Sequence, residues 1–179
     1  MRTKYGKASV CIAVVFLLLG VSIWYYAAHS SSEISIDQNT YYPVIHVMDG
    51  DTFQVQIGTK PATVRLLGID TPETVDPRKP VQCFGKEASD ETKSLVTGRT
   101  IQLKLNPHRE TRDKYGRYLA YAYRDDGLFV NEFLLNGGYA REYTFGSAYS
   151  FQKEFRDDQT AAQKDGKGLW KECAQVGGK

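Results

Sequence analysis

Hydrophobic and polar residues alternate in five stretches of the chain, which is the pattern of strands with one buried face. The predicted strands cover residues 44–48, 52–57, 62–69, 100–105 and 117–123. In the fourth stretch, Ile101, Leu103 and Leu105 would face inward between polar neighbours. Turn sequences, Asp-Gly-Asp and then Gly-Thr-Lys-Pro, separate the first three strands. These three strands are therefore expected to form an antiparallel meander.

Three further stretches repeat apolar residues at helical spacing. They predict a helix over 84–96, a short helix that begins at Asn131 as its N-cap, and a last helix over 149–164. Three strands, a helix and two more strands is the order of a five-stranded OB-type barrel. We expect a mainly β, α+β fold with three helices in one domain, residues 43–173, followed by a flexible tail at 174–179.

The N-terminus contains an apolar run that the barrel does not need. Residues 10–28 carry no charge and follow Arg2, Lys4 and Lys7. About 20 apolar residues span a bilayer, and a basic flank stays in the cytoplasm. Residues 1–29 are predicted to be a transmembrane anchor, with a cleavable signal peptide as the alternative. Either one places the domain outside the cytoplasm, membrane-anchored or secreted, behind a polar linker at 30–42.

The formal net charge of +2 does not describe the domain. Three of the 23 Lys and Arg residues precede the apolar run, which leaves 20 against 21 Asp and Glu residues that all follow it. Proteins that hold duplex DNA through non-specific phosphate contacts are normally basic. A near-neutral domain argues against that class, so any nucleic acid must be bound by a local cluster.

The chain contains three cysteines. Cys11 lies in the apolar run and is explained as a small apolar residue. Cys83 and Cys173 belong to the exported domain, where oxidising conditions allow thiols to pair. A disulfide between them would join the first helix to the tail of the domain. Two free thiols remain the alternative, because sequence spacing does not test disulfide geometry.

The third predicted strand runs into a turn with two carboxylates. Residues 65–73 read Arg-Leu-Leu-Gly-Ile-Asp-Thr-Pro-Glu, and the proline ends the strand and turns Glu73 back toward Arg65. Asp51, in the first hairpin turn, would face Asp70 across neighbouring strand ends. Two close carboxylates repel each other unless they are protonated or bridged by a cation. Oxygen ligands alone favour a hard cation, Ca²⁺ or Mg²⁺.

The segment that leads into the fifth strand is rich in charge. Its Arg117, with Arg65 on the adjacent strand, would form a bidentate clamp for a phosphate. Tyr115, beside Lys114, offers a ring on which a base can stack. A merely solvated basic loop is the alternative. Taken together, two guanidinium groups to stabilise developing charge and Glu73 near the attacking water predict phosphodiester hydrolysis.

Six short motifs occur in one order along the chain: Asp-Gly-Asp-Thr at 49–52, the nonapeptide 65–73, Gly-Lys-Glu-Ala at 85–88, Asp-Lys-Tyr-Gly-Arg at 113–117, Val-Asn at 130–131 and Gly-Leu-Trp at 168–170. With them the chain resembles the staphylococcal nuclease (thermonuclease) family over about residues 44–170, in particular its exported or membrane-anchored bacterial members. The resemblance implies an OB-fold phosphodiesterase with Ca²⁺ as cofactor. Such an enzyme cleaves DNA and RNA, preferably single-stranded or denatured, and leaves 3′-phosphate ends; we expect a monomer.

The resemblance also assigns site residues by position. It implies Asp51, Asp70 and the backbone carbonyl of Thr71 as Ca²⁺ ligands, Arg65, Glu73 and Arg117 as catalytic residues, and Lys114 and Tyr115 as nucleotide contacts. Glu73 is expected to be essential, whether or not it is the general base. Residues 139–150 depart from the family pattern, which leaves Tyr143 and Tyr149 as candidate stacking residues only.

Two functions other than an active nuclease are alternatives for an OB-type domain. A non-catalytic nucleic-acid-binding OB module would need Arg65 and Arg117 but would have no use for Glu73. An oligosaccharide-binding OB domain would show exposed aromatic side chains on the barrel face. It would not require an arginine pair beside a carboxylate cluster.

Overall fold

The computed structural model describes residues 17–22, 24, 34–74 and 80–174. The chain divides into two compact units, Met1–Ser35 and Ile36–Lys179. In the first unit residues 17–22 are helical, and most of the predicted anchor, like the tail beyond 174, lies outside the described residues. Among the residues that are described, no helix has both the length and the apolar character needed to cross a membrane.

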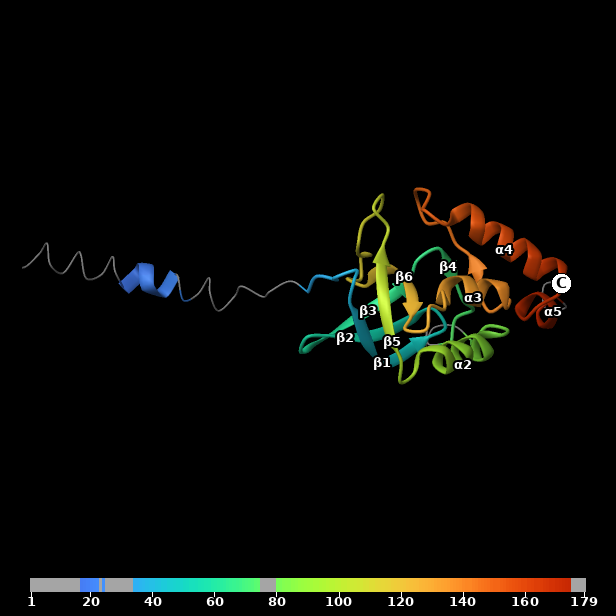
Figure 1. Ribbon diagram of the computed structural model, residues 1–179, viewed down its shortest axis with the longest axis horizontal. Helices are drawn as coiled ribbons and strands as arrows, with labels where there is room; N and C mark the ends of the chain where they lie inside the picture. The colour runs from blue at the N-terminus through green and yellow to red at the C-terminus, as the bar shows by residue number, and fades with distance from the viewer. Residues whose placement is uncertain (1–16, 23, 25–33, 75–79, 175–179) are drawn as a thin grey trace, which may run out of the picture. The chain divides into compact units, whose positions relative to one another are not determined.

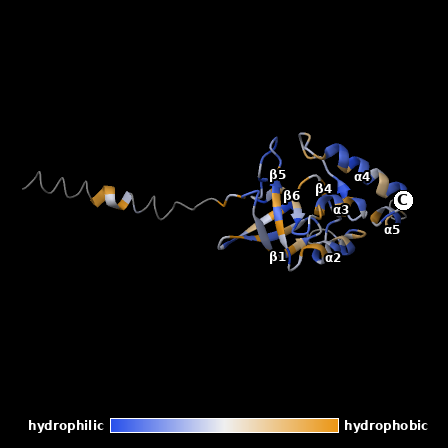
Figure 2. Cartoon of the chain, viewed as in Figure 1, coloured by the Kyte–Doolittle hydropathy of each residue, from blue (hydrophilic) through white to orange (hydrophobic). Residues whose placement is uncertain are grey.

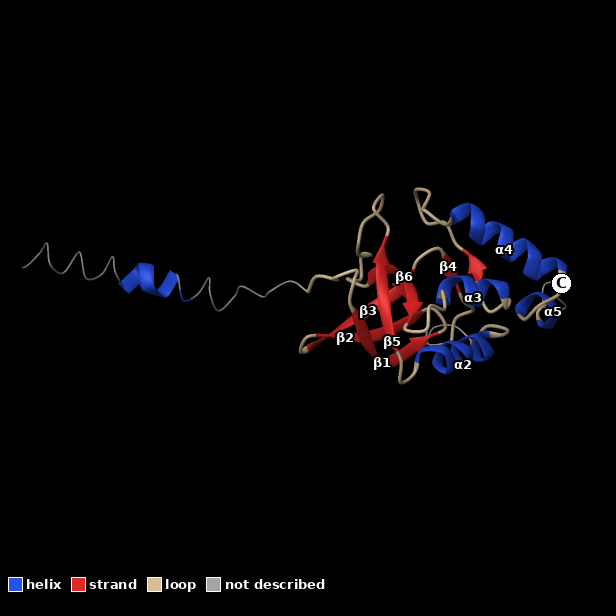
Figure 3. Ribbon diagram, viewed as in Figure 1, coloured by secondary structure: helices blue, strands red, loops and turns tan. Residues whose placement is uncertain are grey.

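The second unit contains the predicted barrel (Figures 1 and 3). Its strands are β1 (Tyr41–Asp49), β2 (Thr52–Ile57), β3 (Lys60–Leu66), β5 (Thr100–Leu105) and β6 (Tyr118–Arg124). They close in the order β1-β2-β3-β6-β5, with β5 pairing back to β1. All pairs are antiparallel except β3 with β6, which run parallel. The five-stranded OB-type barrel with helices is confirmed.

The barrel interior follows the alternation in the sequence. Phe53, Val64, Ile101 and Leu103 have no exposed surface, and Leu66 has 1 %. The helices α2 (Gly85–Val96), α3 (Val130–Asn136), α4 (Gln152–Lys164) and the short α5 (Leu169–Glu172) gather at one end of the barrel. Most of α4 is hydrophilic in Figure 2, and it buries only Phe155 and Ala162. The core is thus a filled barrel with one helical cap.

The first strand begins earlier than the sequence predicts. The first strand starts at Tyr41, and part of the predicted linker already contacts the barrel. Gln38 accepts hydrogen bonds from Lys104 Nζ, at 2.6 Å, and from the Leu105 N–H, at 2.9 Å. The Asp37 N–H donates to the Tyr42 hydroxyl at 2.7 Å. Residues 37 and 38 of the predicted linker therefore contact β1 and the end of β5, where the Gln38 side chain accepts from the Leu105 N–H.

The prediction of one strand over 62–69 is wrong, because the chain turns at Gly68. This glycine has φ of +82°, a left-handed conformation that strands do not use. Leu66 and Leu67 are consecutive and both buried, so the alternation of strand β3 ends there. The chain resumes as β4 (Ile69–Asp70), which pairs with β7 (Arg141–Glu142) in a separate two-stranded sheet.

The prediction that Asn131 caps a helix is also wrong. It lies inside α3 with no exposed surface. Its Oδ1 accepts a hydrogen bond from the Ala122 N–H at 3.0 Å, and its Nδ2 donates to the Leu67 carbonyl at 2.9 Å. Asn131 therefore ties the helix both to strand β6 and to the turn between β3 and β4.

The structure joins Cys83 and Cys173 in a disulfide, with Cα atoms 5.9 Å apart and a sequence separation of 90. The bond links the residue two positions before α2 to the residue that ends α5. It fastens the end of α5 to the segment that leads into α2.

Replacement of both cysteines by serine should lower the free energy of unfolding by about 2–4 kcal/mol, because a long closed loop is released in the unfolded chain. Cys83 is exposed and Cys173 is half-buried, so serine removes little packing. Chemical denaturation measures the change. Each single variant should match the double variant, since either breaks the same bond; an unchanged unfolding midpoint in the double variant would refute the role given to the disulfide.

Candidate active site

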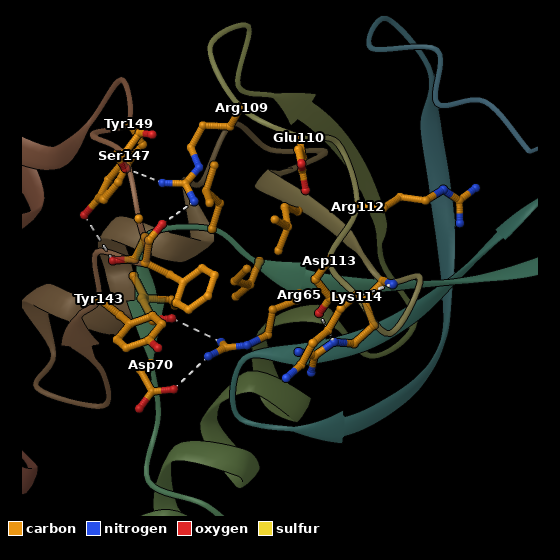
Figure 4. A pocket seen from close by; sticks show the side chains of 18 of the residues that line it. Arg65, Asp70, Arg109, Glu110, Arg112, Asp113, Lys114, Tyr143, Ser147 and Tyr149 are labelled. Carbon is orange, nitrogen blue, oxygen red and sulfur yellow. Dashed lines mark hydrogen bonds and ion pairs between the residues drawn. The ribbon is translucent and has the colours of Figure 1, made fainter.

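The side chain of Arg65 lies at the centre of the site (Figure 4). It projects from β3 and is only 13 % exposed. Its Nη2 lies 2.7 Å from Asp70 Oδ1, and its Nη1 donates to the Ile69 carbonyl at 3.1 Å and also pairs with Asp51. One guanidinium group thus holds carboxylates from the first hairpin turn and from the end of β4, a pairing that the sequence did not indicate.

Asp51 is buried and fully hydrogen-bonded. Its Oδ2 accepts hydrogen bonds from the Thr71 N–H at 3.0 Å and from the Thr71 hydroxyl at 3.2 Å. Its Oδ1 accepts one from the Thr52 hydroxyl at 2.9 Å. The Leu66 N–H donates to the Asp51 carbonyl at 2.9 Å. These bonds fasten the β1–β2 turn to the segment after β4, so Asp51, Asp70 and Thr71 form one acidic edge.

The carboxyl groups of this edge crowd one another. Burial raises the pKa of Asp70, with added repulsion from Asp51, although the charge of Arg65 opposes the shift. Burial also raises the pKa of Asp49, although hydrogen bonds from the Thr74 hydroxyl and the Gly50 N–H act to lower that pKa. The negative charge of Asp51 and contact with the Glu73 carboxyl raise it further. In the sequence, Asp49 stands out only as part of the Asp-Gly-Asp turn.

A hard cation suits this set of donors, because carboxylate and hydroxyl oxygens gather there under mutual repulsion. The residues that line the adjoining cavity of about 310 Å³ include Asp49, Asp51, Asp70, Thr71 and Glu73. In the described part of the domain, no three His, Cys, Asp or Glu side chains are grouped closely enough to hold a metal by themselves. A bound ion would therefore depend on backbone carbonyl and water ligands as well.

Arg117 stands immediately before β6, whose parallel pairing places Tyr118 beside Val64 of β3. The Nε atom of Arg117 lies 2.7 Å from Asp113 Oδ2, and the backbone N–H of Arg117 donates to Asp113 Oδ1 at 3.0 Å. Its guanidinium lies 5.4 Å from the ring centre of Tyr115. Arg65 and Arg117 line the same small cavity, together with Glu73. The predicted arginine pair and the glutamate therefore share one space.

A larger cavity of about 710 Å³ opens beside the first, and Arg65, Asp70 and Arg117 line both. Lys114 and Tyr115 form one side of it, with Lys114 Nζ 5.0 Å from the Tyr115 ring centre. Tyr115 is 72 % exposed, so its ring is open to a stacking partner. All of the predicted catalytic and nucleotide-contacting residues thus lie around two adjoining cavities.

The two tyrosines that the sequence left as candidates have different positions. Tyr143 is 46 % exposed, lines the larger cavity and is stacked against Phe145. Tyr149 is buried: its hydroxyl lies 3.2 Å from the Gly68 carbonyl and 2.9 Å from Glu142 Oε1. Tyr149 therefore supports the turn that carries Arg65 and Asp70 and offers no open face for stacking.

The comparisons with known proteins agree with this arrangement. Residues 63–172 match the model of the family described as staphylococcal nuclease homologue. The thermonuclease of Staphylococcus hyicus is 40 % identical over 140 residues, which cover 78 % of this chain and 81 % of that protein. The thermonuclease of Staphylococcus intermedius is 40 % identical over 129 residues, 72 % of this chain and 75 % of that one. Endonuclease YncB of Bacillus subtilis (strain 168) is 41 % identical over 130 residues, 72 % of this chain and 61 % of YncB.

The turn at Gly68 gives a direct test of how the site is positioned. A Cβ atom at Gly68 would lie 2.7 Å from the Tyr149 ring, in addition to the strain of its positive φ. Gly68→Ala should destabilise the fold by about 2–4 kcal/mol. Gly127→Ala is the matched control, because Gly127 has φ of +89° but nothing within 4 Å of its Cβ position.

The control should lose only about 1 kcal/mol, the cost of the left-handed backbone alone. Thermal or chemical unfolding of both variants measures the difference. Equal destabilisation of the two would show that the contact between Gly68 and Tyr149 does not hold the turn.

Proposed function

This chain belongs to the staphylococcal nuclease family, and we propose that it is a calcium-dependent endonuclease that hydrolyses DNA and RNA to leave 3′-phosphate ends. Its relatives include proteins named thermonuclease and endonuclease. The observation that carries the proposal is the shared cavity: Arg65, Arg117 and Glu73 line it together with the acidic edge. A binding module would have no use for that glutamate.

The two guanidinium groups are the binding and charge-stabilising part of the proposed mechanism. A phosphodiester in the small cavity would lie between Arg65 and Arg117, whose donors match two phosphate oxygens at once. Water attacks phosphorus, the bond to the 5′ oxygen breaks, and that oxygen leaves with a proton as a 5′ hydroxyl. Negative charge grows on the remaining phosphate oxygens during the attack, where preoriented arginines stabilise it.

Glu73 lines the same cavity, from which it would orient the attacking water or take its proton. Its N–H donates to Gln82 Oε1 at 3.1 Å, which fixes the backbone of this loop next to α2. Asp51, Asp70 and the Thr71 carbonyl would hold Ca²⁺, which would supply a Lewis acid for the phosphate and for water. The nucleotide on the far side of the scissile bond would contact Lys114 and Tyr115.

We also propose that the domain acts outside the cytoplasm, either anchored or secreted. The uncharged run at residues 10–28 behind a basic flank supports this location. The disulfide between Cys83 and Cys173 supports it independently, because such bonds persist in oxidising compartments.

Incubation of the purified protein with denatured DNA, with Ca²⁺ or with a chelator in excess, tests the activity. We expect cleavage with Ca²⁺ and none with the chelator. The products should resist extension by a DNA polymerase until a phosphatase has removed their 3′ phosphates. Absence of cleavage under all conditions would overturn the proposal, and binding without cleavage would favour the non-catalytic OB module.

Glu73→Gln should lower kcat by about 10²–10⁴, the range for loss of a catalytic acid or base. The fold should be little affected, because Glu73 is only half-buried in a loop. Glu87→Gln, an exposed glutamate in the first turn of α2, is the matched control and should keep normal kcat. Steady-state cleavage and a melting curve measure both. A folded Glu73→Gln variant with normal turnover would exclude Glu73 from the reaction.

A further inference from the structure

The larger cavity is bounded by two loops that are far apart in sequence. The β5–β6 loop, residues 106–117, carries Lys114 and Tyr115. The β7–α4 loop, residues 143–151, carries Tyr143, Phe145 and Ser147. Neither loop belongs to the barrel sheet, so the width of the cavity depends on what joins the two loops.

Arg109 joins them. It belongs to the β5–β6 loop, and its guanidinium reaches across to the opposite loop beside Ser147 and Tyr149 (Figure 4). Its Nη1 donates to the Ser147 carbonyl and its Nη2 donates to the Phe145 carbonyl. Gly146, between the two acceptors, has φ of +73°. This left-handed residue lets both carbonyls face one guanidinium, an arrangement that a side chain at residue 146 would strain.

A second contact supports the same junction at the base of the loops. The Ser150 hydroxyl donates to Asn106 Oδ1 at 2.8 Å, and Asn106 is only 4 % exposed. The Arg109 N–H donates to the Asn106 carbonyl at 3.3 Å, so the arginine is oriented from the same buried residue. Arg109 is therefore held at its own backbone and at both terminal nitrogens.

The hydrogen-bond partners of Arg109 differ from those of the two arginines that line the small cavity. Its two terminal nitrogens donate to two backbone carbonyls of the β7–α4 loop, whereas Arg65 and Arg117, which line the small cavity, each pair with a carboxylate. Tyr143 and Phe145 lie on the β7–α4 loop. The planes of their rings are 19° from parallel, and both side chains are exposed. Tyr115, also exposed, lies on the other loop. The contacts of Arg109 with the β7–α4 loop, here called the clasp, thus set the distance between the exposed aromatic side chains of the two loops.

We propose that Arg109 is a positioning residue that clasps the β7–α4 loop to the β5–β6 loop and so keeps the nucleotide cavity preformed. The assignment of that cavity to a nucleotide rests on the function proposed above. A preformed cavity avoids the entropic cost of ordering the loop on binding. Loss of the clasp should weaken substrate binding and leave the chemical step at Arg65 and Glu73 intact.

The first test needs no nucleic acid. Chymotrypsin cuts after exposed aromatic residues, and Tyr143 and Phe145 sit on the clasped loop. In the full-length protein, Arg109→Ala should be cut at these two residues about tenfold faster than the parent. Arg99→Ala is the control: Arg99 lies before β5, pairs with Asp125 at 3.8 Å and is not among the residues lining either cavity. It should be cut at the parent rate. Equal rates for Arg109→Ala and the parent would overturn the clasp.

The second test separates a positioning role from a phosphate contact. On single-stranded DNA, Arg109→Ala should raise KM about tenfold with kcat unchanged, as expected when only binding is weakened. The dependence of log KM on log salt should keep the parent slope. Loss of a phosphate contact would instead reduce that slope by about 0.7. Arg109→Lys keeps the charge but not the planar fork, so it should also have raised KM and faster proteolysis.

A normal Arg109→Lys variant together with a reduced salt slope in Arg109→Ala would identify a phosphate contact and overturn the proposal. An equal loss of kcat and kcat/KM would also overturn it, because that pattern marks an interaction made only in the transition state. If the parent protein cleaves no nucleic acid, the proposed function fails. The proteolysis result still decides whether Arg109 holds the loop.

Discussion

The salt bridges from Arg65 to Asp51 and Asp70 are the constraint on which the rest of the site depends. They join a strand of the barrel, the first hairpin turn and the short strand that follows Gly68. Arg65 is 13 % exposed and Asp51 is 8 % exposed, so neither charge can be stabilised by water alone. Removal of one partner from a buried pair costs about 3–5 kcal/mol. The catalytic geometry and local stability therefore rest on the same contacts.

The remainder of the fold supports the turn at Gly68, which leads from Arg65 on β3 to Asp70 on β4. Asn131 of α3 donates to the Leu67 carbonyl, and the Tyr143 N–H donates to the Gly68 carbonyl at 2.9 Å. Tyr149 packs its ring where a side chain at Gly68 would have to lie. The helical cap and the β4–β7 sheet thus act as a brace for the active-site turn, and the disulfide secures the end of that cap.

The barrel, and the gathering of the candidate site residues around adjoining cavities, could be predicted because both depend on local patterns. Alternating apolar residues mark the strands, and Arg65, Glu73 and Arg117 lie in short motifs whose order is itself informative. The break at Gly68 could not be found in this way, since a Leu-Leu-Gly-Ile run fits one strand equally well. Asn131 and Arg109 were missed for another reason. Their partners, Leu67 and Ser147, are distant in sequence. The spacing of apolar residues along a chain does not indicate which side chain will donate to a remote backbone carbonyl.

The proposed calcium site depends on folding that gathers Asp51 and Asp70 around Arg65 into one acidic edge. Titration of Ca²⁺ into the protein by calorimetry tests it most directly, with Asp70→Asn and the control Asp90→Asn, an exposed helix carboxylate paired with Lys86 and Lys93. We expect Asp70→Asn to lose at least about tenfold in affinity for Ca²⁺, a change of about 1.4 kcal/mol in binding free energy. Asp90→Asn should bind Ca²⁺ like the parent protein. Parent-like affinity in Asp70→Asn would contradict this proposal.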